Sequence, residues 1–170
     1  SAQSVVLKSP GSKTGYIRLI EFSGVNGQVP TRPGARTWDT GCFTSIMMRA
    51  KGLNSIYNDA IKMDWWTETP ITELKFGTSK LKIVIFKGPQ GIQVEAYERL
   101  SPPLPQEFPE FKRLSLPFNI MQTVRNREAS RKFFVDQLGF KNFFNGPPVT
   151  AQKEAQMPLG IPLNFTTTSR

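Results

Sequence analysis

The sequence that decides the fold is residues 41–99, GCFTSIMMRAKGLNSIYNDAIKMDWWTETPITELKFGTSKLKIVIFKGPQGIQVEAYER. Its apolar segments predict a strand up to Ala50, a helix that opens after it, and then three strands. The helix is indicated by apolar side chains at three- and four-residue spacings, namely Leu53, Ile56, Tyr57, Ala60 and Ile61. A strand–helix–three-strand unit of this size is too small to close a core alone, so we expect it to pair with another part of the chain.

Two linkers rich in proline and glycine, residues 23–40 and 100–115, separate this unit from the ends of the chain. Residues 1–22 predict a hairpin of two strands. Residues 116–170 predict a strand, a helix and further strands. We therefore expect an α+β protein with three regions of regular structure.

The C-terminal region carries helix signals. Asn126 is the expected N-cap and Gly139 the expected end of this helix. The inner face of the helix is predicted to consist of Phe133, Phe134, Gln137 and Leu138. Strands are predicted before it at 118–124 and after it at 140–144, with one more at 163–168.

An internal repeat links the three regions. Residues 43–49 (FTSIMMR) parallel residues 118–124 (FNIMQTV), and each segment leads into a helix. Residues 15–21 (GYIRLIE) parallel residues 91–98 (GIQVEAYE). We infer that the two end regions are the late and early halves of a second βαβββ module, assembled within one chain or by strand exchange between two chains. This order also suggests a piece of a longer multi-module protein.

The composition excludes several kinds of site. The 170 residues include no histidine, which excludes a histidine base, a Ser-His or Cys-His nucleophile pair and an imidazole metal ligand within the chain. The one cysteine, Cys42, excludes an internal disulfide and is expected to be an inert buried side chain. This cysteine usage indicates a reducing compartment, so we expect a cytoplasmic protein.

The charge favours anionic partners. The formal net charge is +9, but the basic residues are scattered along the chain, so we do not expect nucleic-acid binding. No apolar run has the length of a membrane helix, and no membrane partner is expected.

The chain resembles a known superfamily. The residues that carry the resemblance are TSIMMR at 44–49 before a short helix, GPQGIQVE at 88–95, and VRNREASRKFFVDQLGF at 124–140. Together they resemble the vicinal oxygen chelate superfamily, which includes glyoxalase I, bleomycin-resistance proteins and extradiol dioxygenases. The resemblance covers about residues 4–22, 41–99 and 118–145. It implies paired βαβββ modules that form a curved mixed sheet around a cleft.

The resemblance also implies where a divalent metal would bind, with one ligand on the first strand and one on the last strand of each module. The matching positions are Ser45, Asn119, Glu95 and Leu19. Only Glu95 is an ordinary metal ligand, and Glu21 could add a carboxylate if the register changed. We therefore expect no cofactor and no divalent metal, with Glu95 as the single candidate ligand.

These observations predict a domain that binds a small aromatic or anionic molecule without a classical metal site. The expected ligand-binding residues are Ser45, Glu95, Tyr97, Asn119, Glu21, Leu19, Met47 and Met121. The alternative is a lyase, isomerase or dioxygenase whose metal site lies in missing modules or is rebuilt from oxygen ligands. A purely structural or dimerising module is the third possibility. We expect a homo-oligomer or a strand-swapped dimer.

Three residue roles stay open. Glu95 is either a pocket carboxylate or the partner of a lysine or arginine across the sheet. Asn119 points into the cleft or bonds to the local backbone. Trp65 and Trp66 stack on a planar ligand or belong to a core or an interface.

Overall fold

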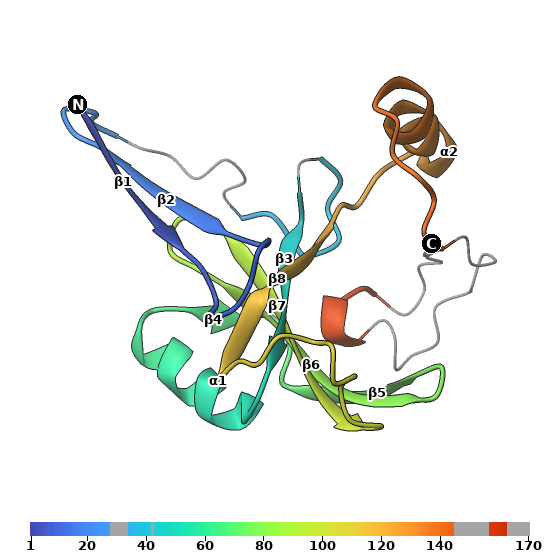
Figure 1. Cartoon of the computed structure of the whole chain (residues 1–170). Coiled ribbons are helices and arrows are strands. Elements are labelled where there is room, and N and C mark those ends of the chain that lie inside the picture. Colours follow the sequence, from blue (N-terminus) through green and yellow to red (C-terminus); the bar gives the residue numbers. More distant parts are fainter. Residues whose placement is uncertain (28–33, 42, 145–156, 163–170) are drawn as a thin grey trace.

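A computed structural model describes residues 1–27, 34–41, 43–144 and 157–162 of the chain (Figure 1). Its elements in chain order are β1 (Ala2–Leu7), β2 (Ile17–Phe22), β3 (Ser45–Ala50), α1 (Leu53–Lys62), β4 (Trp66–Thr67), β5 (Thr72–Phe76), β6 (Ser79–Lys87), β7 (Gln93–Ser101), β8 (Leu114–Met121), α2 (Arg127–Lys132), the π-helical turn η1 (Phe133–Gln137) and the 3₁₀ turn η2 (Met157–Leu159). The predicted α+β class is confirmed.

The body of the molecule is a mixed sheet of six strands. Its order is β4-β6-β7-β3-β8, and β5 also pairs with β6. The pairing of β3 with β7 is parallel, and the other pairings are antiparallel. Residues 45–101 supply every strand of this sheet except β8, so the predicted unit is the centre of the fold (Figure 1).

Helix α1 covers one face of this sheet and forms the core with it. The core consists of Ala50, Leu53, Ile56, Ala60, Val84, Phe86 and Ala96, with Tyr57, Trp65 and Ile71 packed at its edge. They include Leu53, Ile56, Tyr57 and Ala60, whose spacing in the sequence predicts the helix. Trp65 therefore belongs to the core, whereas Trp66 is half-exposed, and Lys87 Nζ lies 4.7 Å from the centroid of its ring.

The start of α1 is fixed by the strand beside it. Gly52 precedes the helix in the left-handed region, at φ 70°, which glycine adopts without the penalty of a Cβ. The carboxylate of Glu98 on β7 accepts hydrogen bonds from the backbone N–H groups of Gly52 at 2.7 Å and Leu53 at 3.2 Å. A carboxylate at this end satisfies unpaired N–H groups and complements the helix dipole.

The other face of the sheet carries the residues that alternate with the core positions. Ala96 of β7 points to α1, so Glu95 and Tyr97 point to the opposite face. We call this surface the polar face. Its residues on β3, β6 and β7 are Ser45, Met47, Arg49, Leu81, Ile83, Ile85, Lys87, Gln93, Glu95, Tyr97 and Arg99.

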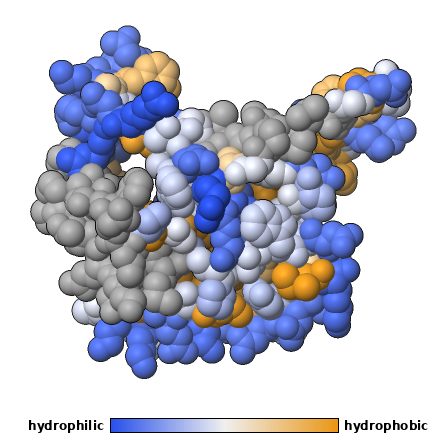
Figure 2. Space-filling model, turned by 180° about the vertical axis from the view of Figure 1, so that it is seen from behind, coloured by the Kyte–Doolittle hydropathy of each residue, from blue (hydrophilic) through white to orange (hydrophobic). Residues whose placement is uncertain are grey.

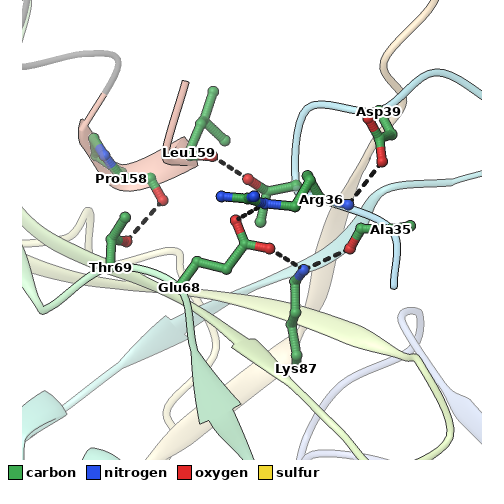
Figure 3. A network of polar contacts seen from close by, with 9 residues as sticks. Ala35, Arg36, Asp39, Glu68, Thr69, Lys87, Pro158 and Leu159 are labelled. Carbon is green, nitrogen blue, oxygen red and sulfur yellow. Dashed lines mark hydrogen bonds and ion pairs between the residues drawn. The ribbon is translucent and has the colours of Figure 1, made fainter. Parts of the chain in front are cut away.

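A group of buried charges closes one end of the polar face (Figure 3). Lys87 on β6 pairs with Glu68, and both side chains are buried. The second oxygen of Glu68 accepts from Arg36 Nε at 3.1 Å, and Lys87 Nζ donates to the carbonyl oxygen of Ala35 at 2.6 Å. We call Arg36, Glu68 and Lys87 the clasp, because they hold the segment before β3 against the sheet.

Residues near the C-terminus lie against the same end. The hydroxyl of Thr37 donates to the carbonyl oxygen of Leu159, and the hydroxyl of Thr69 donates to that of Pro158 at 3.1 Å (Figure 3). Thr37 is almost fully buried, at 1% exposure. The clasp thus joins three parts of the chain that are far apart in sequence.

The hairpin of β1 and β2 forms a sheet of its own and projects from the body (Figures 1 and 2). Within the described residues, its strands pair only with each other, while β8 pairs with β3. The second module expected within one chain is therefore not formed there. The exposed apolar side chains of the hairpin strands are Val5, Val6, Leu7, Leu19, Ile20 and Phe22, each between 48% and 54% exposed.

The C-terminal helix begins as predicted but packs differently. The Asn126 side chain accepts a hydrogen bond from Ala129 N at 2.9 Å, which confirms the N-cap. The predicted inner face is wrong, since Phe133 and Leu138 are half-exposed and α2 with η1 projects away from the sheet (Figure 1). Residues 140–144 form no strand, because this segment lies beside no sheet edge with which it pairs.

Three further findings concern the start of β8, two predictions that fall outside the described residues, and the length of the helices. Strand β8 begins at Leu114, inside the predicted linker 100–115, so this linker is shorter than expected. The predicted strand 163–168 and Cys42 lie outside the described residues. In the described part of the chain, no helix combines the length and the apolar character needed to cross a membrane.

Candidate functional site

Glu95 lies at the centre of the polar face. Its carboxyl is buried, with 3% of the residue exposed. Ser45 Oγ donates to Glu95 Oε2 at 3.0 Å, and the Tyr97 hydroxyl donates to Glu95 Oε1. Burial raises the pKa of Glu95, and the two hydroxyl hydrogen bonds offset only part of this rise. The site therefore favours a neutral carboxyl.

Tyr97 is also held in its neutral form. Burial raises the pKa of the Tyr97 phenol, and the nearby carboxyl of Glu95 raises it further. Tyr97 thus acts as a hydrogen-bond donor to Glu95 and not as a phenolate.

The open alternative of a basic partner for Glu95 is not what the structure contains. Lys87, which lies on this face opposite Gln93, pairs with Glu68 at the clasp. Two hydroxyls occupy the Glu95 oxygens in its place. The direct hydrogen-bond partners of the buried Glu95 carboxyl are therefore neutral hydroxyls and not a cation.

Gln93 adds an unpaired acceptor beside this carboxyl. It lies two residues before Glu95 on β7, so its side chain points to the same face. Gln93 is buried, at 6% exposure, and no described residue forms a hydrogen bond with its Oε1 atom. A buried carbonyl oxygen of this kind is costly unless a ligand or water donates to it. The two-residue period of the strand is the sequence signal that could have identified Gln93.

Aromatic and cationic groups border the site on the other side. The rings of Tyr97 and Phe118 meet edge to face, with their centroids 6.3 Å apart. The guanidinium carbon of Arg49 lies 4.3 Å from the Phe118 centroid and 5.6 Å from that of Tyr97. Neither Arg49 nor Phe118 is among the predicted site residues.

The strand register brings most of the predicted site residues to one face. Met47 lies opposite Glu95 on the neighbouring strand, and Asn119 lies opposite Met47 on the next strand. Met121 lies opposite Ser45 in the same way. Asn119 is exposed, and its Oδ1 atom accepts from Ile120 N at 2.9 Å, which is the local backbone alternative.

Two predicted residues are not part of this arrangement. Leu19 and Glu21 lie on β2, in the separate hairpin sheet, and both are exposed. Glu21 lies opposite Gln3 on β1. The structure thus supplies no second carboxylate to Glu95 from β2.

The donor set at Glu95 does not fit a divalent cation. Such ions prefer one or two ionised carboxylates together with other oxygen ligands. Glu95 favours the neutral form, and each of its oxygens already accepts a hydroxyl hydrogen bond. Among the described residues, no group of three His, Cys, Asp or Glu side chains could hold a metal ion.

Comparison of the chain with protein-family models, curated proteins and solved structures gives no match. The functional argument therefore depends on the site itself.

Proposed function

We propose that this chain is a small-molecule binding domain and that its ligand lies on the polar face beside Glu95. The observation that carries this proposal is a buried carboxyl held only by hydroxyls, next to the unpaired buried oxygen of Gln93. Structural carboxyls in a core are ordinarily paired with a cation, because burial of the charge is costly. This group instead offers both a donor and an acceptor to an uncharged polar group.

The chain topology supports a relation to the vicinal oxygen chelate superfamily. Apart from the two-residue strand β4, which lies between α1 and β5, the elements β3, α1 and β5 to β7 have the order of a βαβββ module, and β3 and β7 are parallel neighbours. In this proposal the Glu95 position, where relatives would carry a metal ligand, serves to bind the ligand directly. Binding without metal chemistry is the function that this donor set favours.

We also propose that the protein is a homo-oligomer that exchanges its hairpin between copies. Both faces of the hairpin expose apolar side chains, as the alternating residues Val5, Val6 and Leu7 show. The segment of α2 and η1 exposes Phe133 and Leu138. Hairpin and helix would complete one module if they came from two chains, as the sequence repeat suggests.

A thermal-shift screen tests the binding function. Phenol, catechol, benzoate and their amide and alcohol analogues are added to the wild-type protein, since a bound ligand raises Tm by mass action. We expect at least one compound to raise Tm for the wild type and for the control Glu73→Gln, which changes an exposed carboxylate. The variant Glu95→Ala should lose this shift.

The outcome against the proposal is also defined. If every compound that raises Tm does so equally in wild type and Glu95→Ala, the polar face is not the binding site. If the whole panel fails while the folded protein is intact by circular dichroism, the chain is a structural module.

An enzymatic alternative has one observation in its favour. A carboxyl with a raised pKa is suited to general acid or base catalysis near neutral pH, and Glu95 is such a group. A lyase or isomerase reaction would then need Glu95 to be ionised in part of the pH range. Turnover of a bound compound that disappears in Glu95→Gln, while binding persists, would favour this alternative.

A further inference from the structure

Two arginines of the polar face lack an anionic partner. Arg49 on β3 and Arg99 on β7 form no ion pair among the described residues. The Nε atom of each side chain is buried and has no hydrogen-bond partner in the part of the chain that the structure describes. Buried arginine groups are ordinarily paired, so two unpaired ones on the same face require an explanation.

The charge of Arg99 acts on the Arg49 guanidinium. Burial lowers the pKa of Arg49, and the positive charge of Arg99 lowers it further. The strand register explains this proximity, since Arg49 lies opposite Tyr97 and Arg99 follows Tyr97 by two residues on the same face. An anion between the two side chains would relieve both the repulsion and the unpaired donors.

We propose that Arg49 and Arg99 together bind the carboxylate of the ligand whose uncharged polar end lies at Glu95 and Gln93. This inference rests on the proposed binding function and narrows its ligand to a small carboxylic acid. Guanidinium groups bind carboxylates through paired N–H groups, which a lysine cannot reproduce. Both arginines are half-buried, so a ligand could reach them from solvent.

The geometry of the strand fixes the approximate size of the ligand. Residues that point to one face of a strand are about 6.8 Å apart, because each residue advances the strand by about 3.4 Å. Arg49 on β3 is level with Tyr97, which is one such step from Glu95 along β7, so Arg49 and Glu95 are diagonal neighbours on this face. The rings of Tyr97 and Phe118 lie next to Arg49 and provide an aromatic wall for the ligand. A substituted benzoate with a polar group opposite its carboxylate has these dimensions.

Calorimetric titration with matched acids and amides tests the inference. The probes are 4-hydroxybenzoate and 4-hydroxybenzamide, together with benzoate and benzamide. Of the two acids, we expect the one with the lower Kd to bind the wild type at least about tenfold more tightly than its own amide does. This ratio corresponds to one ordinary hydrogen bond to a charged group. Arg49→Met and Arg99→Met should each weaken acid binding more than amide binding and so remove this preference.

Controls separate binding from folding. Arg18→Met changes an exposed arginine on the hairpin and should leave the acid preference intact. Arg99→Lys retains the positive charge but lacks the paired N–H groups of a guanidinium, so it should keep only part of the preference for acids over amides. If Arg99 were only structural, Arg99→Met would lower Tm without ligand. An anion subsite predicts an unchanged or higher Tm, because the repulsion is removed.

The results distinguish the two proposals. Equal affinity for acids and amides in the wild type would overturn the anion subsite and leave the binding domain in place. An acid preference that survives both methionine variants would overturn it as well. Failure of all four probes, with no Nε resonance of Arg49 or Arg99 shifted by the acids in NMR spectra, would overturn the inference together with the binding function.

Discussion

Glu95 makes the stability of the protein depend on pH in a defined direction. The pKa of Glu95 is raised in the folded state from the ordinary value of 4.5, so the folded protein binds this proton more tightly than the unfolded chain. This stabilisation is fully present below pH 4.5 and is lost as the pH rises through the folded-state pKa. We expect Glu95→Gln to unfold at higher urea concentration than the wild type at pH 7, with the difference shrinking toward pH 4.

The comparison isolates one group. The difference in free energy of unfolding between the wild type and Glu95→Gln, measured from pH 4 to pH 8, removes the contribution of all other titrating residues. Glu73→Gln, an exposed carboxylate on β5, should show no such pH-dependent gain. A constant difference across this pH range would mean that the pKa of Glu95 is the same in the folded and the unfolded protein.

Gly15 is a second residue with a specific requirement. It adopts φ +72°, and a Cβ added there would overlap the carbonyl oxygen of Pro117 and lie 2.6 Å from Leu116 Cδ1. Gly11 has the same φ of +72° but has nothing within 4 Å of an added Cβ. Both alanine variants should lose about 1–2 kcal/mol for the left-handed backbone. Gly15→Ala should lose clearly more in urea unfolding, and equal losses would show that the hairpin base does not contact β8 in solution.

At the scale of elements, the clasp is the contact most sensitive to substitution. Glu68→Gln leaves the buried ammonium of Lys87 without its carboxylate, and an unpaired buried charge costs about 3–5 kcal/mol. Glu73→Gln breaks the exposed pair of Glu73 with Lys82, which should cost less than about 1 kcal/mol. Urea unfolding of the two variants measures the contrast. Similar small losses in both variants would mean that the clasp is open in solution.

The elements of the central unit could be predicted from local patterns. The apolar spacing in α1 and the continuous apolar run in β6 each predict an element whose apolar residues are buried, and the structure contains both elements. The segment Phe140–Phe144 carries a similar apolar pattern but forms no strand, because a strand also needs a free sheet edge. An apolar pattern therefore predicts correctly those elements that find a packing partner in the fold. It also predicts strands, such as 140–144, in segments that have no such partner.

The site could be predicted only in part. The resemblance predicts Ser45 on the first strand and Glu95 on the last strand of one module. The parallel pairing of β3 with β7 makes these strands neighbours, and the two side chains form a hydrogen bond. Gln93 and Arg49 follow from the strand period once one face is known to be functional. The clasp and the neighbouring contact of Thr37 with Leu159 could not be predicted, since they join residues across long stretches of sequence.

At the scale of the whole molecule, the hairpin determines the oligomeric state that we expect. Replacement of Leu19 and Ile20 by lysine places charges on both faces of β2, whose side chains are half-exposed in the single chain. Sedimentation equilibrium should show a dimer for the wild type and a monomer for this variant. Phe76→Lys, at a residue 71% exposed on β5, should remain dimeric. A wild-type monomer at all concentrations would contradict the strand exchange.

The parallel pairing of β3 with β7 also has a consequence for the order in which the protein folds as it is synthesised. Strand β3 cannot complete that pair until Glu98 has left the ribosome, and the synthesis of the residues between Ala50 and Glu98 takes several seconds at typical rates. Its other edge waits longer, because β8 ends at Met121. During this interval β3 is an apolar strand without neighbouring strands, and an unpaired strand edge of this kind can associate with other nascent chains.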